Sequence, residues 1–457
     1  MIPKLQLKFE IERLKMNIIK SRERSAIISS LQAGLTPKSG INHFYVGRSK
    51  EIEQLETNLN DLADGGSFVR FIIGNYGSGK TILLELAKLF AHKRRIVVAS
   101  ADISMDKILC STNHKSRNLY AALINKLSTT DYTTGNTLES IIQTWADNLR
   151  QQYPENPFEH RRIFDLLAPL RKHEHYSDFC HIIETYLNAY DNGDKNVKEN
   201  ALRWLRGEFR LITEAKQCLN VRSIIDDKNW YSQLKLFADF VCLAGYKGLL
   251  VNIDEMAVLS RLNTRTRNAN YERILEIINE VVPGNVSRIG FLFGGTKDFL
   301  QNRQKGLYSY DALRGRLEGN VFASDERPDY TGPAIFLQTL SKEEFRVLSE
   351  NLRNVYAFND ESKYLLNDAE CAAFVDWFFG RLGSEANSSP REFIKTFLGL
   401  LSQLENYPDT KIEDYLKGVQ VKAEHEPSNN DVIDDEPEDS SSLNNDGDLF
   451  DFKNYRL

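Results

Sequence analysis

The alternation of apolar and polar positions along the chain predicts short buried strands separated by amphipathic helices. Continuous apolar runs bounded by turn residues are typical of strands that are buried on both faces of a sheet. Such runs occur at residues 69–73, 95–103, 247–255, 288–295 and 334–340. Helical patterns lie between them. Strands that alternate with helices indicate an α/β fold with a parallel sheet covered on both faces.

A long helical segment interrupts this alternation. Residues 104–246 separate the second from the third predicted strand, far more than the roughly dozen residues that a crossover between parallel strands needs. The pattern from about 130 to 235 is helical, so we predict a large insertion there. Its tryptophans are expected to belong to a hydrophobic core rather than to a platform that stacks on bases. They are Trp145, Trp204 and Trp230.

The two ends of the chain differ from the predicted core at residues 41–340. Residues 1–40 are predicted to form an amphipathic helical lead-in that ends in LTPKSG. Ser341 and Glu344 have the spacing of a capping box, which predicts the start of a helical lid after the last strand. We assign residues 341–420 to this lid and consider a small winged-helix-like module at about 365–420 within it.

The last 37 residues, 421–457, have a composition of their own. They contain eleven acids and three bases, so the rest of the chain is slightly basic although the whole carries a net charge of −6. This balance excludes a uniformly basic nucleic-acid binder and remains compatible with contact to DNA. Asp, Glu, Ser and Asn dominate the tail, so we predict disorder up to its aromatic end, LFDFKNYRL. Such a tail can dock a partner protein, screen a basic groove until DNA arrives, or simply keep the protein in solution.

Composition also bears on location. No apolar run approaches the length of a transmembrane helix, and the first residues include acids and lack the apolar stretch of a secretory signal. The five cysteines are scattered without a CxxC pair. These features predict a protein of the reducing cytoplasm, without a membrane partner.

The segment after the first predicted strand matches G-x-x-x-x-G-K-[ST], the phosphate loop of P-loop nucleotide-binding proteins. Glycines let backbone N–H groups surround the phosphates without side-chain clashes, and the following helix points its positive end at the anion. Lys80 provides positive charge to the β- and γ-phosphates, and Thr81 provides a hydroxyl ligand to Mg²⁺. A buried strand and an apolar helix flank the motif, which is the context it requires. It consists of Gly74, Asn75, Tyr76, Gly77, Ser78, Gly79, Lys80 and Thr81.

The third predicted strand ends in an acidic pair, Asp254 and Glu255. The end of this strand is expected beside the phosphate loop. We assign Asp254 to holding Mg²⁺, through water, and Glu255 to polarising the attacking water. The pair favours hydrolysis of ATP over transfer to a small acceptor, so a nucleotide kinase-like transferase is disfavoured.

As a set, these motifs resemble those of the AAA+ ATPases, in particular the origin-recognition/Cdc6-like and STAND branch. FYVGRSKEIEQL is similar to the segment that precedes the phosphate loop there. The resemblance implies that Val46, Gly47 and Arg48 pack on the adenine. It also implies the fold: an AAA+-like P-loop NTPase with a parallel sheet, a helical insertion and a helical lid.

Two later segments extend the resemblance to the residues that sense the γ-phosphate. GFLFGGT is similar to the sensor-1 strand, which implies that Thr296 occupies the sensing position, where Asn is commoner. SPRE at 389–392 is similar to the sensor-2 motif of the lid, which implies that Arg391 lies near the γ-phosphate.

Longer segments are similar to the ATP-binding proteins of BREX-type bacterial anti-phage defence systems. They include GGSFVRFIIGNYGSGKT, LRGE at 205–208, AGYKGLLVNIDE, GLYSYDALRGRL and SPREFIK, and the resemblance covers residues 22–415. In such ATPases the active site lies between subunits, and an arginine of the neighbour reaches the γ-phosphate. The resemblance therefore implies a homo-oligomer, with Arg316, and after it Arg314, as the candidates.

Other clusters are expected to be structural or solvated. His173, His175, Cys180 and His181 match no standard zinc-ligand spacing. The basic clusters at 20–24 and 93–95 are more typical of solvated faces than of phosphate-binding sites.

Two functions remain from the sequence. The first is an ATP-hydrolysing, DNA-associated motor or loader that works with a helicase in bacterial defence. The alternative is a slowly hydrolysing, STAND-like nucleotide switch that recruits a separate effector through the insertion or the tail.

Overall fold

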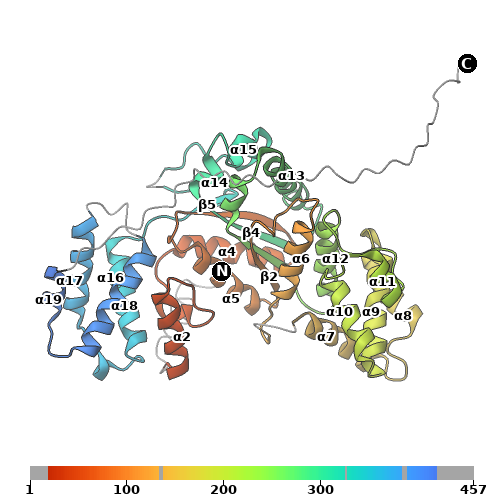
Figure 1. Cartoon of the computed structure of the whole chain (residues 1–457), viewed down its shortest axis with the longest axis horizontal. Coiled ribbons are helices and arrows are strands. Elements are labelled where there is room, and N and C mark those ends of the chain that lie inside the picture. The colour runs from red at the N-terminus through yellow and green to blue at the C-terminus, as the bar shows by residue number, and fades with distance from the viewer. Residues whose placement is uncertain (1–18, 133–136, 325–326, 383–388, 419–457) are drawn as a thin grey trace, which may run out of the picture.

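A five-stranded parallel sheet forms the centre of the molecule (Figure 1). The computed structural model describes residues 19–132, 137–324, 327–382 and 389–418. The strands follow the order β2-β3-β4-β1-β5, and every pair is parallel. This confirms the predicted α/β fold with a parallel sheet. The strands are β1 (Phe68–Ile73), β2 (Val97–Asp102), β3 (Leu249–Asp254), β4 (Ile289–Gly295) and β5 (Ala334–Phe336).

The last strand is shorter than the predicted range of 334–340. Only Ala334 to Phe336 pair with β1, at the edge of the sheet. The backbone N–H of Leu337 still donates to the Ile73 carbonyl, at 2.7 Å. The chain then continues through residues 338–341 to the lid helix that begins at Lys342.

Helices cover both faces of the sheet, because successive side chains of each strand point to opposite faces. In β1, Val69 and Phe71 pack into one hydrophobic cluster and Ile72 into another. The first cluster lies under α6 (Lys115–Asn125), α12 (Trp230–Leu243) and α13 (Thr264–Val281). The second lies under α4 (Ser49–Ala63) and α5 (Lys80–Lys93).

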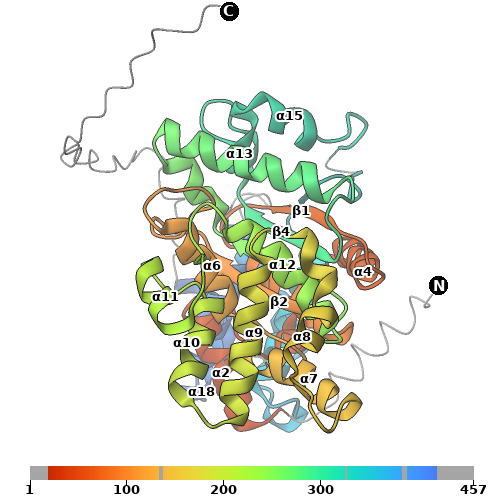
Figure 2. The ribbon, with the colours of Figure 1, turned by 90° about the vertical axis from the view of Figure 1, so that its right-hand side faces the viewer.

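The predicted insertion is a group of helices between β2 and β3, and Figure 2 shows several of them in front of the sheet. Trp145, Trp204 and Trp230 are 4%, 1% and 0% exposed, so all three belong to the core. The predicted range of about 130–235 contains α7 (Thr137–Gln152), α8 (His160–Leu166), η1 (Ala168–Lys172), α9 (Tyr176–Asp191), α10 (Lys195–Leu205) and α11 (Ile212–Leu219), whereas α6 and most of α12 lie outside it.

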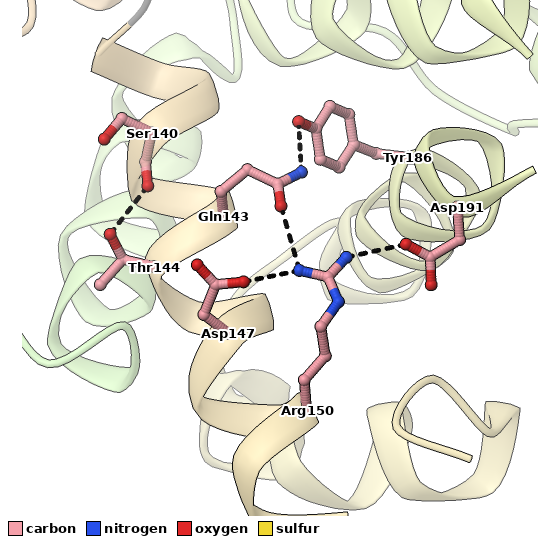
Figure 3. Close-up of polar contacts among 7 residues, drawn as sticks. All are labelled: Ser140, Gln143, Thr144, Asp147, Arg150, Tyr186 and Asp191. Atoms are coloured by element: carbon pink, nitrogen blue, oxygen red, sulfur yellow. Dashed lines mark hydrogen bonds and ion pairs between the residues drawn. The ribbon is translucent and has the colours of Figure 1, made fainter. Parts of the chain in front are cut away.

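Polar contacts join α7 to α9 within this insertion (Figure 3). The guanidinium of Arg150 forms ion pairs with Asp147 at 2.7 Å and with Asp191 at 2.8 Å. Gln143 donates to the hydroxyl of Tyr186 at 2.9 Å. Side-chain ion pairs and hydrogen bonds between α7 and α9 therefore stabilise the insertion in addition to its apolar core.

The C-terminal helices form the end of the molecule opposite the insertion (Figure 1). Ser341 and Glu344 form the predicted capping box, with both reciprocal hydrogen bonds present. The described residues of 341–418 contain helices and no strand, so the winged-helix-like module has no β-wing within them. These helices are α16 (Lys342–Tyr356), η4 (Glu361–Lys363), α17 (Asp368–Leu382), α18 (Pro390–Asn406) and α19 (Ile412–Gly418).

The N-terminal helix α2 (Ser21–Gln32) packs against these C-terminal helices, in the same hydrophobic cluster as α16 and α18. Arg24 fixes the contact, since its guanidinium donates to the Tyr356 carbonyl at 2.9 Å and lies 4.3 Å from the centre of the Tyr356 ring. A short helix, α3 (Ile41–Phe44), follows α2. The predicted domain boundaries at 40, 340 and 420 stay predictions.

Four short elements connect the later strands: η2 (Met256–Arg261), α14 (Lys297–Gln301), η3 (Leu307–Ser309) and α15 (Asp311–Leu317). None of the helices in the described part of the chain is both long and apolar enough to cross a bilayer. The predicted disordered tail, 421–457, lies outside the described residues, as does the first part of the lead-in.

Candidate nucleotide-binding site

The phosphate loop connects β1 to α5 and requires glycine at several positions. Gly77 and Gly79 have φ of 74° and 94°, in the left-handed region that favours glycine. A Cβ atom at Gly77 would lie 3.0 Å from the Ser389 hydroxyl, and one at Gly74 would clash with the Ser78 hydroxyl. The loop therefore has the narrow backbone turn that lets N–H groups face an anion.

Lys80 is held inside this loop. Its Nζ donates to the carbonyl oxygens of Gly74 and Asn75, each at 2.9 Å. It also lies 5.4 Å from the centre of the Tyr76 ring. The ammonium group is thus preorganised at the concave side of the loop, where a phosphate would accept a hydrogen bond from it.

Thr81 and Asp254 meet at the same edge of the sheet. Along β3, Leu250, Asn252 and Asp254 point to the α5 face. The hydroxyl of Thr81 donates to Oδ2 of Asp254 at 2.7 Å. Gly294 on the neighbouring strand β4 makes room for this carboxylate, because a Cβ there would overlap Oδ1 of Asp254. Both oxygens are hard ligands of the kind that Mg²⁺ prefers.

Glu255 follows Asp254 in a strained backbone conformation. Its φ is 57°, unusual for a residue with a side chain, and its N–H donates to Oδ1 of Asp254 at 2.8 Å. Desolvation by the surrounding protein raises the pKa of Glu255, and the negative charge of Asp254 raises it further. The positive charges of Lys80 and Arg391 lower this pKa. Such an environment is typical of a carboxylate that accepts a proton.

Of the two predicted sensor residues, Arg391 lines the pocket and Thr296 does not. Thr296 follows β4 directly and caps α14, its hydroxyl accepting from the N–H of Phe299 at 3.1 Å. Gly295 just before it accepts from the N–H of Gly74. Arg391 lies in the first turn of α18 and lines the same pocket as Lys80 and Glu255.

A pocket opens between the phosphate loop, the start of α18 and the end of α2. Its walls include four residues that the sequence pattern missed, all from the lead-in that we had separated from the core. One of them is the apolar Leu35, whose exposed fraction of 64% is high for a leucine. The lining residues are Leu31, Gly34, Leu35, Thr36, Tyr76, Gly77, Gly79, Lys80, Thr81, Ile82, Glu255, Pro390, Arg391 and Ile394.

The segment expected to pack on adenine is not among these lining residues. Val46 packs into the cluster of the lid, and a Cβ at Gly47 would overlap the Glu344 carboxylate at the start of α16. Arg48 is only 8% exposed and donates to the Ser78 carbonyl at 2.5 Å. The structure thus places Arg48 behind the phosphate loop, where it fixes the loop backbone.

The candidate trans-acting arginines lie away from this pocket, on α15. Arg316 donates to the side chain of Asn279 at 2.7 Å and to the Ala312 carbonyl at 2.8 Å. Arg314 forms an ion pair with Asp311 at 3.2 Å. Neither lines the site of its own chain, and their role toward a neighbouring subunit stays a prediction.

The clusters that we regarded as structural have local partners. His173 contacts Asp239 at 2.7 Å, and His181 contacts the Leu219 carbonyl at 2.8 Å. No group of three or more His, Cys, Asp or Glu side chains could hold a metal ion within the described residues. In the cluster at 93–95, Arg94 pairs with Glu56 at 3.5 Å.

Comparison with known proteins identifies the family. The sequence model of the "BREX system ATP-binding protein BrxC/D" family matches residues 19–420. The chain belongs to this family. The match confirms the resemblance inferred from the motifs and makes the pocket at the phosphate loop of this BREX ATP-binding protein its candidate ATP site.

Two solved structures of the Aeropyrum pernix ORC2 protein are similar to this BREX protein. The structure of its ADPNP–ADP complexes shares 14% identity, covering 82% of this chain and 69% of that chain, with a TM-score of 0.38. The ADP form also shares 14% identity, over 82% of this chain and 67% of that chain, with a TM-score of 0.40. No curated protein matches the sequence.

Proposed function

We propose that this chain hydrolyses ATP with Mg²⁺ at the pocket and that DNA stimulates the reaction. One observation carries the hydrolysis: Glu255, next to the Mg²⁺-ligand candidate Asp254, lines the pocket together with Lys80. A carboxylate at that point can orient and polarise a water molecule for attack on the γ-phosphate.

Each residue of the site has a distinct part in this proposal. The loop from Gly74 to Thr81 and Lys80 bind the phosphates, and Thr81 with Asp254 holds the Mg²⁺, which neutralises phosphate charge when bound. Arg391, from the lid, stabilises the charge that develops on the γ-phosphate, and Thr296 contributes a hydroxyl from the end of β4. The carbon-rich walls, including Leu31, Leu35 and Ile394, suit an apolar base.

Assembly and DNA belong to the same proposal. The arginine on α15 would reach the γ-phosphate of a neighbouring subunit, so the active site is complete only in a homo-oligomer. We propose that the assembly acts on DNA as a motor or loader together with a helicase, in BREX defence in the cytoplasm. Family membership supports the link to BREX, and the slight positive charge of the body supports contact with DNA.

The proposal is tested by ATP hydrolysis with and without DNA in variants of two residues. Lys80→Ala should lose ATP binding and turnover, whereas Glu255→Gln should keep ATP binding and lose turnover by at least about a hundredfold. Glu174→Gln, an exposed carboxylate on the insertion, is the matched control and should behave as the wild type. DNA-stimulated turnover that persists in Glu255→Gln contradicts the role of that residue.

The same measurement separates the switch from the motor. Tight ATP binding with negligible turnover, with or without DNA, would favour the STAND-like switch. The size of the insertion supports this alternative, because its helices α7 to α11 offer a broad surface for an effector.

A further inference from the structure

Two segments that follow the catalytic strands are rich in bases and poor in acids. Residues 256–271, after β3, contain three arginines and no Asp or Glu. Residues 296–306, after β4, contain three bases and one acid, Asp298. We name the six bases the basic edge: Arg261, Arg265, Arg267, Lys297, Arg303 and Lys305.

The fold brings these segments together, because β3 and β4 are parallel neighbours and both end at the same edge of the sheet. Tyr271 connects them, since its hydroxyl donates to the Lys305 carbonyl at 2.6 Å. Burial raises the pKa of this phenol; the nearby charge of Arg267 lowers that pKa and the charge of Asp298 raises it. Nearby, Asn270 is fully buried and bonds both the N–H and the carbonyl of Cys110, at 3.0 Å each. The surface is thus a fixed arrangement rather than a set of independent loops.

Much of this positive charge is not neutralised. Arg265, Lys297 and Arg303 are exposed, and within the described residues no carboxylate lies within ion-pair distance of them. Arg265 and Arg267 also lie in the first turn of α13, which contains no acid. Cations there oppose the helix dipole and lower the stability of the folded chain. Unpaired positive charges that lower the stability of the folded chain are typical of a site for an anionic ligand, which would neutralise them.

Polar side chains and helix starts extend the basic edge as a surface for phosphates. The helices α6 and α13 follow β2 and β3 in the chain, and each has a base in its first turn: Lys115 and Arg265. Asn268 and Thr264 lie exposed between the arginines of α13. Bases, helix N-termini and short polar side chains are the groups that contact a DNA backbone without reading its sequence.

We propose that the basic edge binds the phosphate backbone of DNA beside the ATP site. The proposal deepens the proposed function and rests on it. The connection between the two sites is covalent and short: η2 begins directly after Glu255, and α14 directly after Thr296. A backbone seated on these elements would therefore act on the residues that polarise water and sense the γ-phosphate. That placement gives DNA a direct route to stimulate hydrolysis.

The test is binding of a fluorescently labelled DNA duplex by the full chain over a series of salt concentrations. The triple variant Arg265→Ala, Lys297→Ala, Arg303→Ala removes exposed charge and no buried contact. Each lost phosphate contact lowers the slope of log K against log salt by about 0.9, so the triple should lower it by about 2 to 3. Affinity at low salt should fall at least about tenfold.

A second triple variant is the matched control. Arg161→Ala, Lys216→Ala and Lys247→Ala remove three exposed bases elsewhere on the molecule and should change neither the slope nor the affinity. Binding of a fluorescent ATP analogue reports that both triples are folded. If the wild type binds DNA and the basic-edge triple keeps its slope, the basic edge is wrong and the DNA-stimulated function stands. If the wild type binds no DNA, the basic edge and the proposed stimulation by DNA are both wrong.

Discussion

The hydroxyl of Thr81 donates a 2.7 Å hydrogen bond to Oδ2 of Asp254, and this contact joins the phosphate loop to the end of β3. The two residues lie 173 positions apart in the sequence. Strand alternation turns Asp254 toward α5, and the first turn of α5 carries Thr81. The pair is therefore the point where the binding half and the hydrolytic half of the site meet.

Removing the hydroxyl of Thr81 should separate the two halves. Thr81→Ala loses both the bond to Asp254 and one oxygen for Mg²⁺, so ATP turnover should fall by about 10- to 100-fold and need more Mg²⁺. Thr81→Ser retains the hydroxyl and should stay close to the wild type. A titration of turnover against Mg²⁺ for the two variants makes the comparison. Equal Mg²⁺ dependence in both would contradict the assignment.

Gly294 should be intolerant of a side chain. A Cβ there overlaps Oδ1 of Asp254, so Gly294→Ala must displace this buried carboxylate and should cost about 1 to 3 kcal/mol of unfolding free energy. Gly399→Ala is the control, because a Cβ at Gly399, within α18, meets no atom within 4 Å. It should stabilise the protein by about 0.5 to 1 kcal/mol, since alanine favours the helix. Chemical denaturation of both variants measures the change in unfolding free energy, which should be negative for Gly294→Ala and positive for Gly399→Ala.

The pKa of Glu255 predicts how hydrolysis depends on pH. A water-polarising carboxylate acts when deprotonated, and its pKa lies above the ordinary 4.5, so activity should fall on the acid side at a higher pH than for a solvated glutamate. Arg391→Gln removes a positive charge that lowers this pKa. The acid limb of its pH–activity profile should therefore move to higher pH. Arg346→Gln, an exposed arginine of α16, should leave the limb in place, and an Arg391→Gln limb that moves downward contradicts the assignment.

The arginine on α15 is tested by mixing two inactive variants. Glu255→Gln retains Arg316 but cannot polarise water, and Arg316→Ala retains Glu255 but offers no arginine. If Arg316 acts on the neighbour, mixed assemblies contain complete sites, and mixing should restore part of the ATP turnover. The same mixture with Arg314→Ala decides between the two candidates. A mixture that stays as inactive as its components excludes action between subunits for the arginine tested.

Local sequence was enough for the parts of the site that are continuous in the chain. The phosphate loop follows a buried strand, and Asp254–Glu255 ends another, so the period of two and the parallel arrangement place them at one edge. The capping box at Ser341 is also a local signal, because both of its partners lie within one helical turn.

The remaining parts depend on contacts between distant segments. The end of α2 lines the pocket because Leu31 and its neighbours pack on α18, which no periodicity reveals. Each segment of the basic edge is rich in bases by itself, but only the pairing of β3 with β4 shows that the two segments lie at one edge of the sheet. The left-handed backbone of Glu255 has no sequence signal either, because glutamate rarely adopts it.

The most direct test of the account is steady-state ATP hydrolysis by the purified wild-type chain, with and without DNA, with molar mass followed by light scattering in the same samples. We predict turnover that rises with DNA and rises as subunits assemble, because the site needs Glu255 from one chain and an arginine from the next. Tight ATP binding without turnover, at every DNA and protein concentration, would contradict hydrolysis at this site.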